Sequence, residues 1–343
     1  MNQRGVHHIR YGIVLMLVLV CVSALSCRLV PSGVKQRAYE GKAPLDDTSR
    51  AAPGAADASC EPDAPCRPFY GMQFVYRDDL DKVKELGIEV IMADLRHDET
   101  PADWLSFMNA AQAQGLRVVP HLWPEGWTWD GTAWQIDAQA RLFLQTVAGH
   151  PALFAVYALH EPYWNDCEGC GYTTATQQAL YRDLKAIADV PLYSEIGSIA
   201  GWTARGRATA FADGVCDYCA VWYSPFKDGG IYERARLITN LTANLAVARK
   251  RAPHSKIVWL MPAYVYPPDH KRMPTADEMR DLASIVYSKD VAGAWWYPWK
   301  FGDLYSDYLF NHPELYPTVK SIYEDYVREA KAACCGDSSQ AAP

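Results

Sequence analysis

Residues 89–123, EVIMADLRHDETPADWLSFMNAAQAQGLRVVPHLW, contain the pattern that decides the fold. A short apolar segment, Glu89–Asp94, predicts a buried strand, and the longer segment Ala102–Gln114 predicts a helix. Pro101 stands at the first position of that helix, where its missing N–H costs nothing. A second apolar segment, Arg117–Leu122, follows the helix. A strand, a helix and a strand in this order are typical of a parallel βαβ unit.

The same alternation continues from Phe69 to Ala333. We expect strands over Tyr70–Phe74, Glu89–Asp94, Arg117–Leu122, Phe154–His160, Leu192–Ile196, Tyr218–Trp222, Ile257–Ala263 and Gly293–Tyr297. Helices are expected after each strand, over Asp79–Leu86, Ala102–Gln114, Ala138–Gly149, Thr174–Ala188, Gly201–Ala212, Tyr232–Arg251, Asp277–Ser288 and Tyr316–Ala333. Eight such units predict an α/β fold with one domain, a (β/α)8 TIM barrel. A doubly wound sheet is the alternative, but the Gly-rich turn that it would carry after its first strand is missing, since Gly71 stands alone.

Composition limits the classes of function. The 343 residues are 50% hydrophobic and 21% charged, which argues against a disordered chain and against a protein with many membrane spans. The formal net charge of −7 argues against nucleic acid as a partner, because binding to phosphates needs clustered Lys and Arg. The 12 Trp and 21 Tyr residues suit an uncharged ligand that stacks on aromatic rings, such as a sugar.

Residues 1–27 predict a signal peptide. Two arginines precede the apolar segment Tyr11–Leu25, which is shorter than the roughly 20 residues that a membrane span needs. Its end resembles a bacterial lipoprotein signal, in which the cysteine, here Cys27, becomes the lipidated N-terminus. Ala24 and Leu25 reverse the usual order of a large and a small residue in that signal. We therefore expect an exported protein, either attached to the cell envelope through Cys27 or secreted.

Three further segments complete the expected organisation. Residues 28–67 are rich in Pro, Gly, Ala, Ser and Asp and show no apolar period, which predicts a flexible linker. Residues 68–333 form the predicted barrel domain, and residues 334–343 a C-terminal tail. Apart from Cys21 and Cys27, the cysteines are even in number, which in an exported chain suggests disulfides: Cys60, Cys66, Cys167, Cys170, Cys216, Cys219, Cys334 and Cys335. Their pairing stays open, with the closely spaced pairs as candidates for local bridges.

Two of the cysteine pairs have the spacing of a zinc site, but the predicted fold separates them. Cys167 and Cys170 follow strand four at the top of the barrel, whereas Cys216 and Cys219 lie at the start of strand six at the bottom. We expect no metal site. The segment Met72–Val75 also lacks the His-x-His of metal-dependent barrel hydrolases. Neither a P-loop nor a Gly-x-Ser-x-Gly turn occurs, and we expect no cofactor.

Polar and aromatic side chains gather at the carboxyl ends of the predicted strands, and the opposite ends are plain. In a TIM barrel the carboxyl ends of the strands carry the chemistry. The candidate site residues at or just after these ends are Asp94, His121, Trp123, His160, Glu161, Trp164, Glu195, Tyr223, Tyr264, Trp296, Trp299 and Asp303. This asymmetry is the strongest indication of function in the sequence.

One of these ends carries a family resemblance. Ala158-Leu159-His160-Glu161-Pro162 resembles the end of strand four in the clan-A (β/α)8 glycoside hydrolases, where Asn-Glu-Pro or Asp-Glu-Pro holds the general acid. The segments Arg272–Thr275 and Gly293–Tyr297 resemble stretches of divergent members of the same superfamily. The resemblance implies hydrolysis of a glycosidic bond in a carbohydrate. It departs from the family at strand seven, where Met261-Pro262-Ala263-Tyr264 replaces the usual nucleophilic Glu.

Hydrolysis of this kind needs two carboxyl groups. Glu161 is the candidate acid, because the aromatic residues around it, Tyr157 among them, would desolvate it and raise its pKa. Glu195, on the adjacent strand, is the candidate second carboxylate, and Asp94 and Asp303 are the other contenders. Each glutamate also has a purely structural alternative: Glu161 as a buried group held by an Arg or His, and Glu195 as a partner of His160 or of a tyrosine.

The remaining candidates are expected to bind the substrate. Trp123, Trp164, Trp296 and Trp299 follow strand ends, where rings stack on sugar faces, although Trp also serves as packing. Polar groups that orient hydroxyls are expected from the other substrate-binding candidates: Asp94, His121, His160, Tyr223, Tyr264 and Asp303. Trp127, Trp129 and Trp134 share one long loop, and for them we favour packing or a lid.

A second class of function fits the same sequence. A barrel that has lost its activity could serve as a surface lipoprotein that binds glycans or acts as a scaffold. The missing Glu at strand seven supports this alternative.

Overall fold

The computed structural model describes residues 68–123, 125–162, 173–200, 211–227, 230–266, 271–300 and 306–330. The predicted signal peptide with Cys27, the linker and the tail lie outside these residues, as do Trp164, Asp303, Cys167 and Cys170. No helix within the described ranges has the length and apolar character that a membrane crossing requires.

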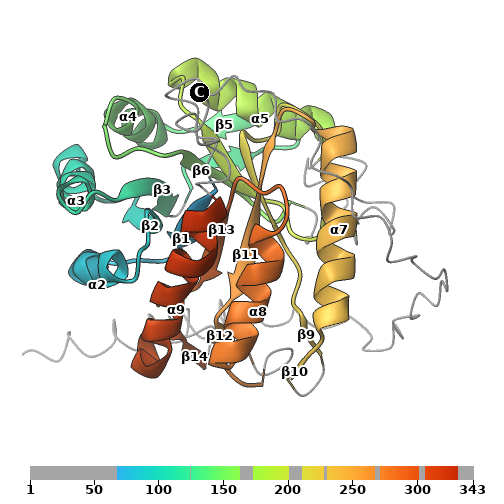
Figure 1. Ribbon diagram of the computed structural model, residues 1–343. Helices are drawn as coiled ribbons and strands as arrows, with labels where there is room; N and C mark the ends of the chain where they lie inside the picture. Colours follow the sequence, from blue (N-terminus) through green and yellow to red (C-terminus); the bar gives the residue numbers. More distant parts are fainter. Residues whose placement is uncertain are drawn as a thin grey trace, which may run out of the picture. The chain divides into compact units, whose positions relative to one another are not determined.

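Eight parallel strands form the central sheet, in the order β3-β2-β1-β13-β11-β8-β7-β6, and helices surround its outer face (Figure 1). The strands are β1 (Phe69–Met72), β2 (Val90–Arg96), β3 (Arg117–Trp123), β6 (Val156–His160), β7 (Leu192–Glu195), β8 (Tyr218–Trp222), β11 (Lys256–Pro262) and β13 (Gly293–Tyr297). Each of the eight predicted strands is present, within two residues of its expected ends. The predicted single-domain (β/α)8 barrel is confirmed.

The helices alternate with these strands as expected. They are α2 (Leu80–Glu85), α3 (Pro101–Ala113), α4 (Ala138–Val147), α5 (Thr174–Ile187), α7 (Arg234–Arg251), α8 (Ala276–Tyr287) and α9 (Tyr316–Ile322), which continues into the π-helix η5 (Tyr323–Val327). The helix predicted over 201–212 lies almost wholly outside the described residues. Two of these helices begin with capping boxes, formed by Thr100 with Asp103 and by Thr275 with Glu278, and Pro101 stands at the first position of α3 as predicted.

Short elements follow the carboxyl ends of several barrel strands. They are the hairpin of β4 (Trp127–Trp129) and β5 (Trp134–Ile136), the hairpin of β9 (Phe226–Lys227) and β10 (Ile231–Tyr232), and the pair β12 (Tyr264–Val265) with β14 (Asp307–Tyr308). The 3₁₀ turns η1 (Arg77–Asp79), η3 (Leu309–Asn311) and η4 (Pro313–Leu315) complete the set.

The barrel closes between β3 and β6 by a short contact. Val118 forms a parallel bridge with Leu153, just before β6, and its N–H donates to the Ala152 carbonyl at 2.7 Å. Along the rest of β3 and β6, the described residues pair no further with each other. The Ala158 carbonyl on β6 accepts instead from Nε1 of Trp127, at 2.9 Å. The β4–β5 hairpin therefore supplies the hydrogen bond that a neighbouring strand would give.

Alternation along the strands divides the core into two layers. Phe69, Tyr193 and Trp295 belong to the layer inside the barrel, whereas Trp296 belongs to the layer between strands and helices. Gly71 leaves room for the ring of Trp295 inside the barrel, because a Cβ at that position would overlap the ring. The phase of this alternation decides which strand-end side chains reach the mouth of the barrel.

One disulfide is present among the described residues, between Cys216 and Cys219. Cys216 lies two residues before β8 and Cys219 is the second residue of β8, so the bridge is at the amino end of that strand. This pair is a local bridge, as the spacing predicted, and it is remote from the carboxyl ends of the strands.

Candidate active site

The backbone at Glu161 makes a sharp turn at the end of β6. Glu161 has φ +37°, in the left-handed region that side chains other than glycine seldom adopt. Its N–H donates to the carbonyl of Glu195 at 2.7 Å, which ties the turn to the end of β7. Strain of this kind costs about 1–3 kcal/mol and concentrates at functional positions. The turn fixes the Glu161 side chain at the barrel mouth.

The Glu161 carboxyl is largely buried, with 17% of its side chain exposed. Nε1 of Trp222, at the end of β8, donates to its Oε1 at 2.5 Å. Nε2 of His160 lies 3.8 Å from its Oε2. Burial raises the pKa of Glu161, and the nearby imidazole and the Trp222 hydrogen bond offset only part of that effect. Glu161 therefore keeps its proton to a higher pH than a free glutamate, as a general acid must.

Glu195, the last residue of β7, is 4% exposed and uses both of its oxygens. Oε1 accepts from Nε2 of Gln73 at 2.8 Å and from the Tyr193 hydroxyl at 3.3 Å. Oε2 lies 3.1 Å from Nδ1 of His160. Burial acts to raise the pKa of Glu195, but the hydrogen bond and charge of His160, with Gln73, outweigh it and lower the pKa. Glu195 is therefore an ionised carboxylate, and each of its two oxygens already has a hydrogen-bond partner.

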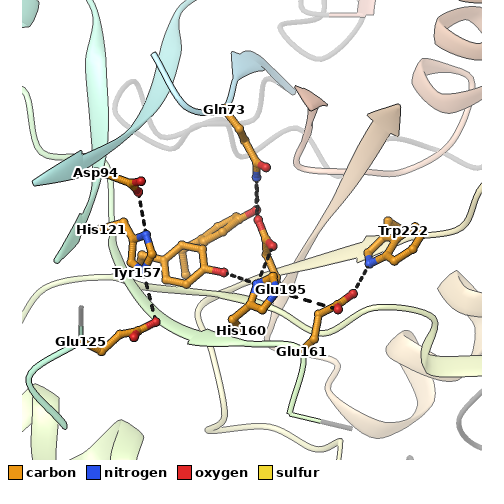
Figure 2. A network of polar contacts seen from close by, with 10 residues as sticks. Gln73, Asp94, His121, Glu125, Tyr157, His160, Glu161, Glu195 and Trp222 are labelled. Carbon is orange, nitrogen blue, oxygen red and sulfur yellow. Dashed lines mark hydrogen bonds and ion pairs between the residues drawn. The ribbon is translucent and has the colours of Figure 1, made fainter. Parts of the chain in front are cut away.

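His160 joins the two glutamates (Figure 2). Its Nδ1 faces Glu195 and also lies 2.8 Å from the Tyr157 hydroxyl, while its Nε2 faces Glu161. Burial acts to lower the pKa of His160, but the hydrogen bond and charge of Glu195 outweigh it and raise the pKa. Since only one imidazole ring separates them, the nearest oxygens of the two carboxyls lie within the roughly 9.5 Å limit of glycosidase pairs.

A second polar group lies beside the first, around His121. Nδ1 of His121 is 2.8 Å from Oδ1 of Asp94 on β2, and its Nε2 is 3.2 Å from Oε1 of Glu125. Burial acts to lower the pKa of His121, but these two carboxylates outweigh it and raise the pKa to about 9. The His121 ring lies 4.3 Å from the Tyr157 ring, centroid to centroid, so the two groups form one continuous network.

The structure brings five of the sequence-predicted residues into this network: Asp94, His121, His160, Glu161 and Glu195. Trp123 lies next to it, with its ring 5.4 Å from that of His121, and is 51% exposed.

Four other candidates lie elsewhere. Trp296 is fully buried behind β13, where its Nε1 donates to the Tyr70 hydroxyl at 2.5 Å, and Trp299 is buried against Phe310 and Tyr316. Arg236 donates to the Tyr223 hydroxyl and stacks on its ring. Tyr264 is buried and its ring packs edge-on to that of Tyr297. None of the four is in the polar network.

Sequence reasoning did not assign Gln73, Glu125, Tyr193 or Trp222 to the site. Gln73 directly follows β1, so a buried polar residue at a strand end was the available signal. Trp222 ends β8 in the same way. Glu125 lies in the loop after β3 and carried no signal. Of the three loop tryptophans, Trp127 and Trp134 donate to main-chain carbonyls, of Ala158 and Thr176.

The end of β11 offers no acidic group. Met261 and Ala263 are both fully buried there. Within the described part of the chain, no set of three or more His, Cys, Asp or Glu residues has the arrangement of a metal site.

Known proteins resemble this chain only distantly. No family model matches the sequence, and no curated protein matches it. Among solved structures, an apo form of mutant Saccharomyces cerevisiae Gas2p is similar over 76% of this chain and 61% of that chain, with 12% identity and a TM-score of 0.49. A GH113 β-1,4-mannanase complex is similar over 75% of this chain and 98% of that chain, with 10% identity and a TM-score of 0.46.

An endo-1,4-β-mannanase from Eisenia fetida covers 66% of this chain and 78% of its own, with 14% identity and a TM-score of 0.42. The chain thus spans 61% of the length of the Gas2p structure. At these identities and TM-scores, the likenesses assign neither an activity nor a substrate to this chain.

Proposed function

We propose that this protein hydrolyses a glycosidic bond, with Glu161 as the general acid. The observation that carries the proposal is the Glu161–His160–Glu195 arrangement, in which a carboxyl with raised pKa and a carboxylate with lowered pKa share one imidazole. Two carboxyl groups whose surroundings move their pKa values apart are the usual basis of acid and base roles in glycosidases.

In this reaction the Glu161 proton passes to the leaving oxygen as the bond from that oxygen to the anomeric carbon breaks. Water supplies the hydroxyl that the anomeric carbon gains and the proton that restores the acid. Trp222 stabilises the Glu161 carboxylate left behind, through its hydrogen bond to Oε1. Glu195 is the proposed second carboxylate. Donors bind both of its oxygens, which keeps it ionised beside Glu161.

The test is a panel of oligosaccharides incubated with the wild type, Glu161→Gln and Glu195→Gln. We expect Glu161→Gln to lower kcat by about 10² to 10⁴ while the affinity for the glycan is retained. Glu324→Gln, an exposed glutamate in η5, is the matched control and should cleave at the wild-type rate. Cleavage that survives Glu161→Gln would place the acid at another residue, with Asp94 and Asp303 as the next candidates.

The non-catalytic alternative has its own support. The end of β11 supplies no carboxylate, and both oxygens of Glu195 already have hydrogen-bond partners within the protein. If the wild type and the variants bind the same oligosaccharides and cleave none of them, the function is glycan binding instead.

We also propose that the chain is exported and attached to the cell envelope through Cys27, on the basis of the sequence of residues 1–27. Attachment through several acyl chains is stable, whereas a single chain binds a membrane only marginally. Cys27→Ser should release the protein from the membrane fraction. If the unmodified protein is soluble and its mature form begins beyond Cys27, the protein is secreted without a lipid.

A further inference from the structure

An exposed indole lies at one side of the barrel mouth. Large apolar side chains that are exposed within the described residues are Tyr76, Trp123, Leu142 and Ile231. Trp123 ends β3 and lies two residues beyond His121, so the two side chains share the face of the strand that leads into the mouth. An indole with an accessible face is the side chain best suited to stack on the apolar face of a sugar ring.

Carboxylates accompany this indole. Asp94 and Glu125 each bind one nitrogen of His121 and are each about a quarter exposed, with side-chain fractions of 29% and 27%. The second oxygen of Asp94 accepts no hydrogen bond from another described residue, whereas His121 is buried between the two carboxylates. The imidazole therefore orients the carboxylates, and their outer oxygens are the groups that can accept from a ligand.

The described residues on the other side of the mouth lack these features. At the ends of β11 and β13, the side chains of Met261, Ala263, Trp296 and Trp299 are fully buried. Their burial leaves no exposed indole on that side within the described residues. From Glu161, the network continues through His160 and Tyr157 to His121, and so toward β3 and β2.

We propose that a hexopyranose chain without anionic groups extends from Glu161 toward β3 and β2, with one sugar ring on Trp123 and its hydroxyl or amino groups on Asp94 and Glu125. The inference rests on the proposed function, since it names the substrate class and its direction across the same site. Trp123, Asp94 and Glu125 are binding residues in this proposal, and His121 is a positioning residue.

Charge decides the class of sugar. Three carboxylates, those of Asp94, Glu125 and Glu195, face two imidazoles in the network, and the fourth acidic residue, Glu161, is the proposed proton donor. The nearby cations have other contacts: Arg96 binds Asp98, and Nζ of Lys300 lies over the rings of Tyr76 and Phe310. A uronic acid on Trp123 would place its carboxylate against Asp94 and Glu125, and that contact is repulsive.

The test compares binding of three oligosaccharide probes of equal length: a neutral hexose oligomer, a glucosamine oligomer and a galacturonic acid oligomer. Affinities are measured by calorimetry for the wild type, Trp123→Ala, Trp123→Tyr and Asp94→Asn. We expect the wild type to bind the neutral or the glucosamine probe and not the galacturonate. Trp123→Ala should lose about tenfold in affinity, with part of the loss restored in Trp123→Tyr, because the ring is the binding element.

Asp94→Asn keeps an acceptor for His121 and removes one negative charge. It should therefore lower the affinity for the glucosamine probe more than the affinity for the neutral probe. Ile231→Ala, an exposed residue on the β9–β10 hairpin, is the control and should bind as the wild type does. Binding or cleavage that is unchanged in Trp123→Ala would overturn the binding site while leaving the proposed hydrolysis intact. Preference for galacturonate would overturn the charge argument. Binding without cleavage, lost in Trp123→Ala, would support the site and reject the hydrolysis.

Discussion

Glu161 and Glu195 end adjacent strands of one sheet, yet their surroundings move the pKa values of their carboxyls in opposite directions. The difference lies in hydrogen bonds: Glu161 accepts from Trp222 alone among the contacts described for its side chain, whereas donors hold both oxygens of Glu195. Burial dominates for Glu161, and the donors dominate for Glu195. Two residues of one type thus acquire different protonation states from their neighbours.

Trp222 gives a direct test of the acid at this scale. Its hydrogen bond favours the ionised form of Glu161 and so lowers the pKa that burial has raised. Trp222→Phe removes that bond, so Glu161 should stay protonated to higher pH. The alkaline limb of the pH profile of kcat/KM should move upward by about one pH unit.

The control for this variant is Trp134→Phe, which also removes an indole hydrogen bond, to Thr176, but outside the polar network. Its pH profile should coincide with that of the wild type. An alkaline limb that stays in place in Trp222→Phe would mean that Glu161 does not set it.

The shifted pKa of His121 makes the stability of the fold depend on pH. Its pKa rises from 6.5 to about 9 on folding, because Asp94 and Glu125 outweigh the effect of burial. A raised pKa stabilises the folded state fully below about pH 6.5, and the contribution is lost as the pH rises toward about 9. The shift corresponds to on the order of 3 kcal/mol.

We expect the free energy of unfolding of His121→Gln to be lower than that of the wild type at pH 6, and the difference to be smaller at pH 9. Urea unfolding at several pH values measures it. His150→Gln is the control, since the ring of His150 contacts Asn109 and the Ala152 N–H and no described carboxylate. Burial lowers the pKa of His150, so any stability advantage of the wild type over His150→Gln should not shrink as the pH rises. A difference between His121→Gln and the wild type that is constant with pH would contradict the ionised state of His121.

The residue scale also shows where sequence reasoning ends. The position of Glu161 at the barrel mouth was predictable, because its motif lies at the end of a clear strand. The roles of Trp295 and Trp296 were not, because neighbouring residues of β13 point to opposite sides, and the sequence does not state the phase of that alternation. For Gln73 the sequence offered only a polar residue at a strand end, because its partners come from β7, far along the chain.

At the scale of elements, the apolar strands and capped helices were predictable, because each carries a local signal. The β4–β5 hairpin was not, because its strands are short and its tryptophans suit packing as well as pairing. Its role depends on a distant partner, the Ala158 carbonyl of β6. Long-range hydrogen bonds of this kind have no signature in local sequence.

Trp127→Phe tests the role of the hairpin. The ring would still fill its place, but the buried Ala158 carbonyl would lose its donor, and an unpaired buried group costs about 1–3 kcal/mol. We expect the free energy of unfolding to fall by that amount in urea titrations. Trp129→Phe, on the same hairpin, is the control, because its indole donates to none of the described residues. Equal stability of the two variants would show that the bond contributes nothing.

At the scale of the whole molecule, the order of strands and helices in the barrel was predictable, because each βα unit repeats the same pattern of apolar residues. The weak closure between β3 and β6 was not, because the strand sequences on either side of it look like the others. Only the assembled sheet shows that β3 bridges the chain before β6 at Val118 and Leu153, with no further ladder between the two strands among the described residues.

This missing ladder has a consequence for motion. Main-chain amides near the carboxyl ends of β3 and β6 lack the mutual bonds that protect a central strand such as β11, so their hydrogens should exchange with solvent sooner. A sugar chain held by Trp123 on one strand and Glu161 after the other would join the two sides of this opening. Hydrogen–deuterium exchange should then slow at β3 and β6 when a glycan binds, and stay unchanged at β11. Uniform slowing throughout the barrel would show that the opening does not move independently. The least closed part of the sheet would thus be the part that a ligand makes rigid.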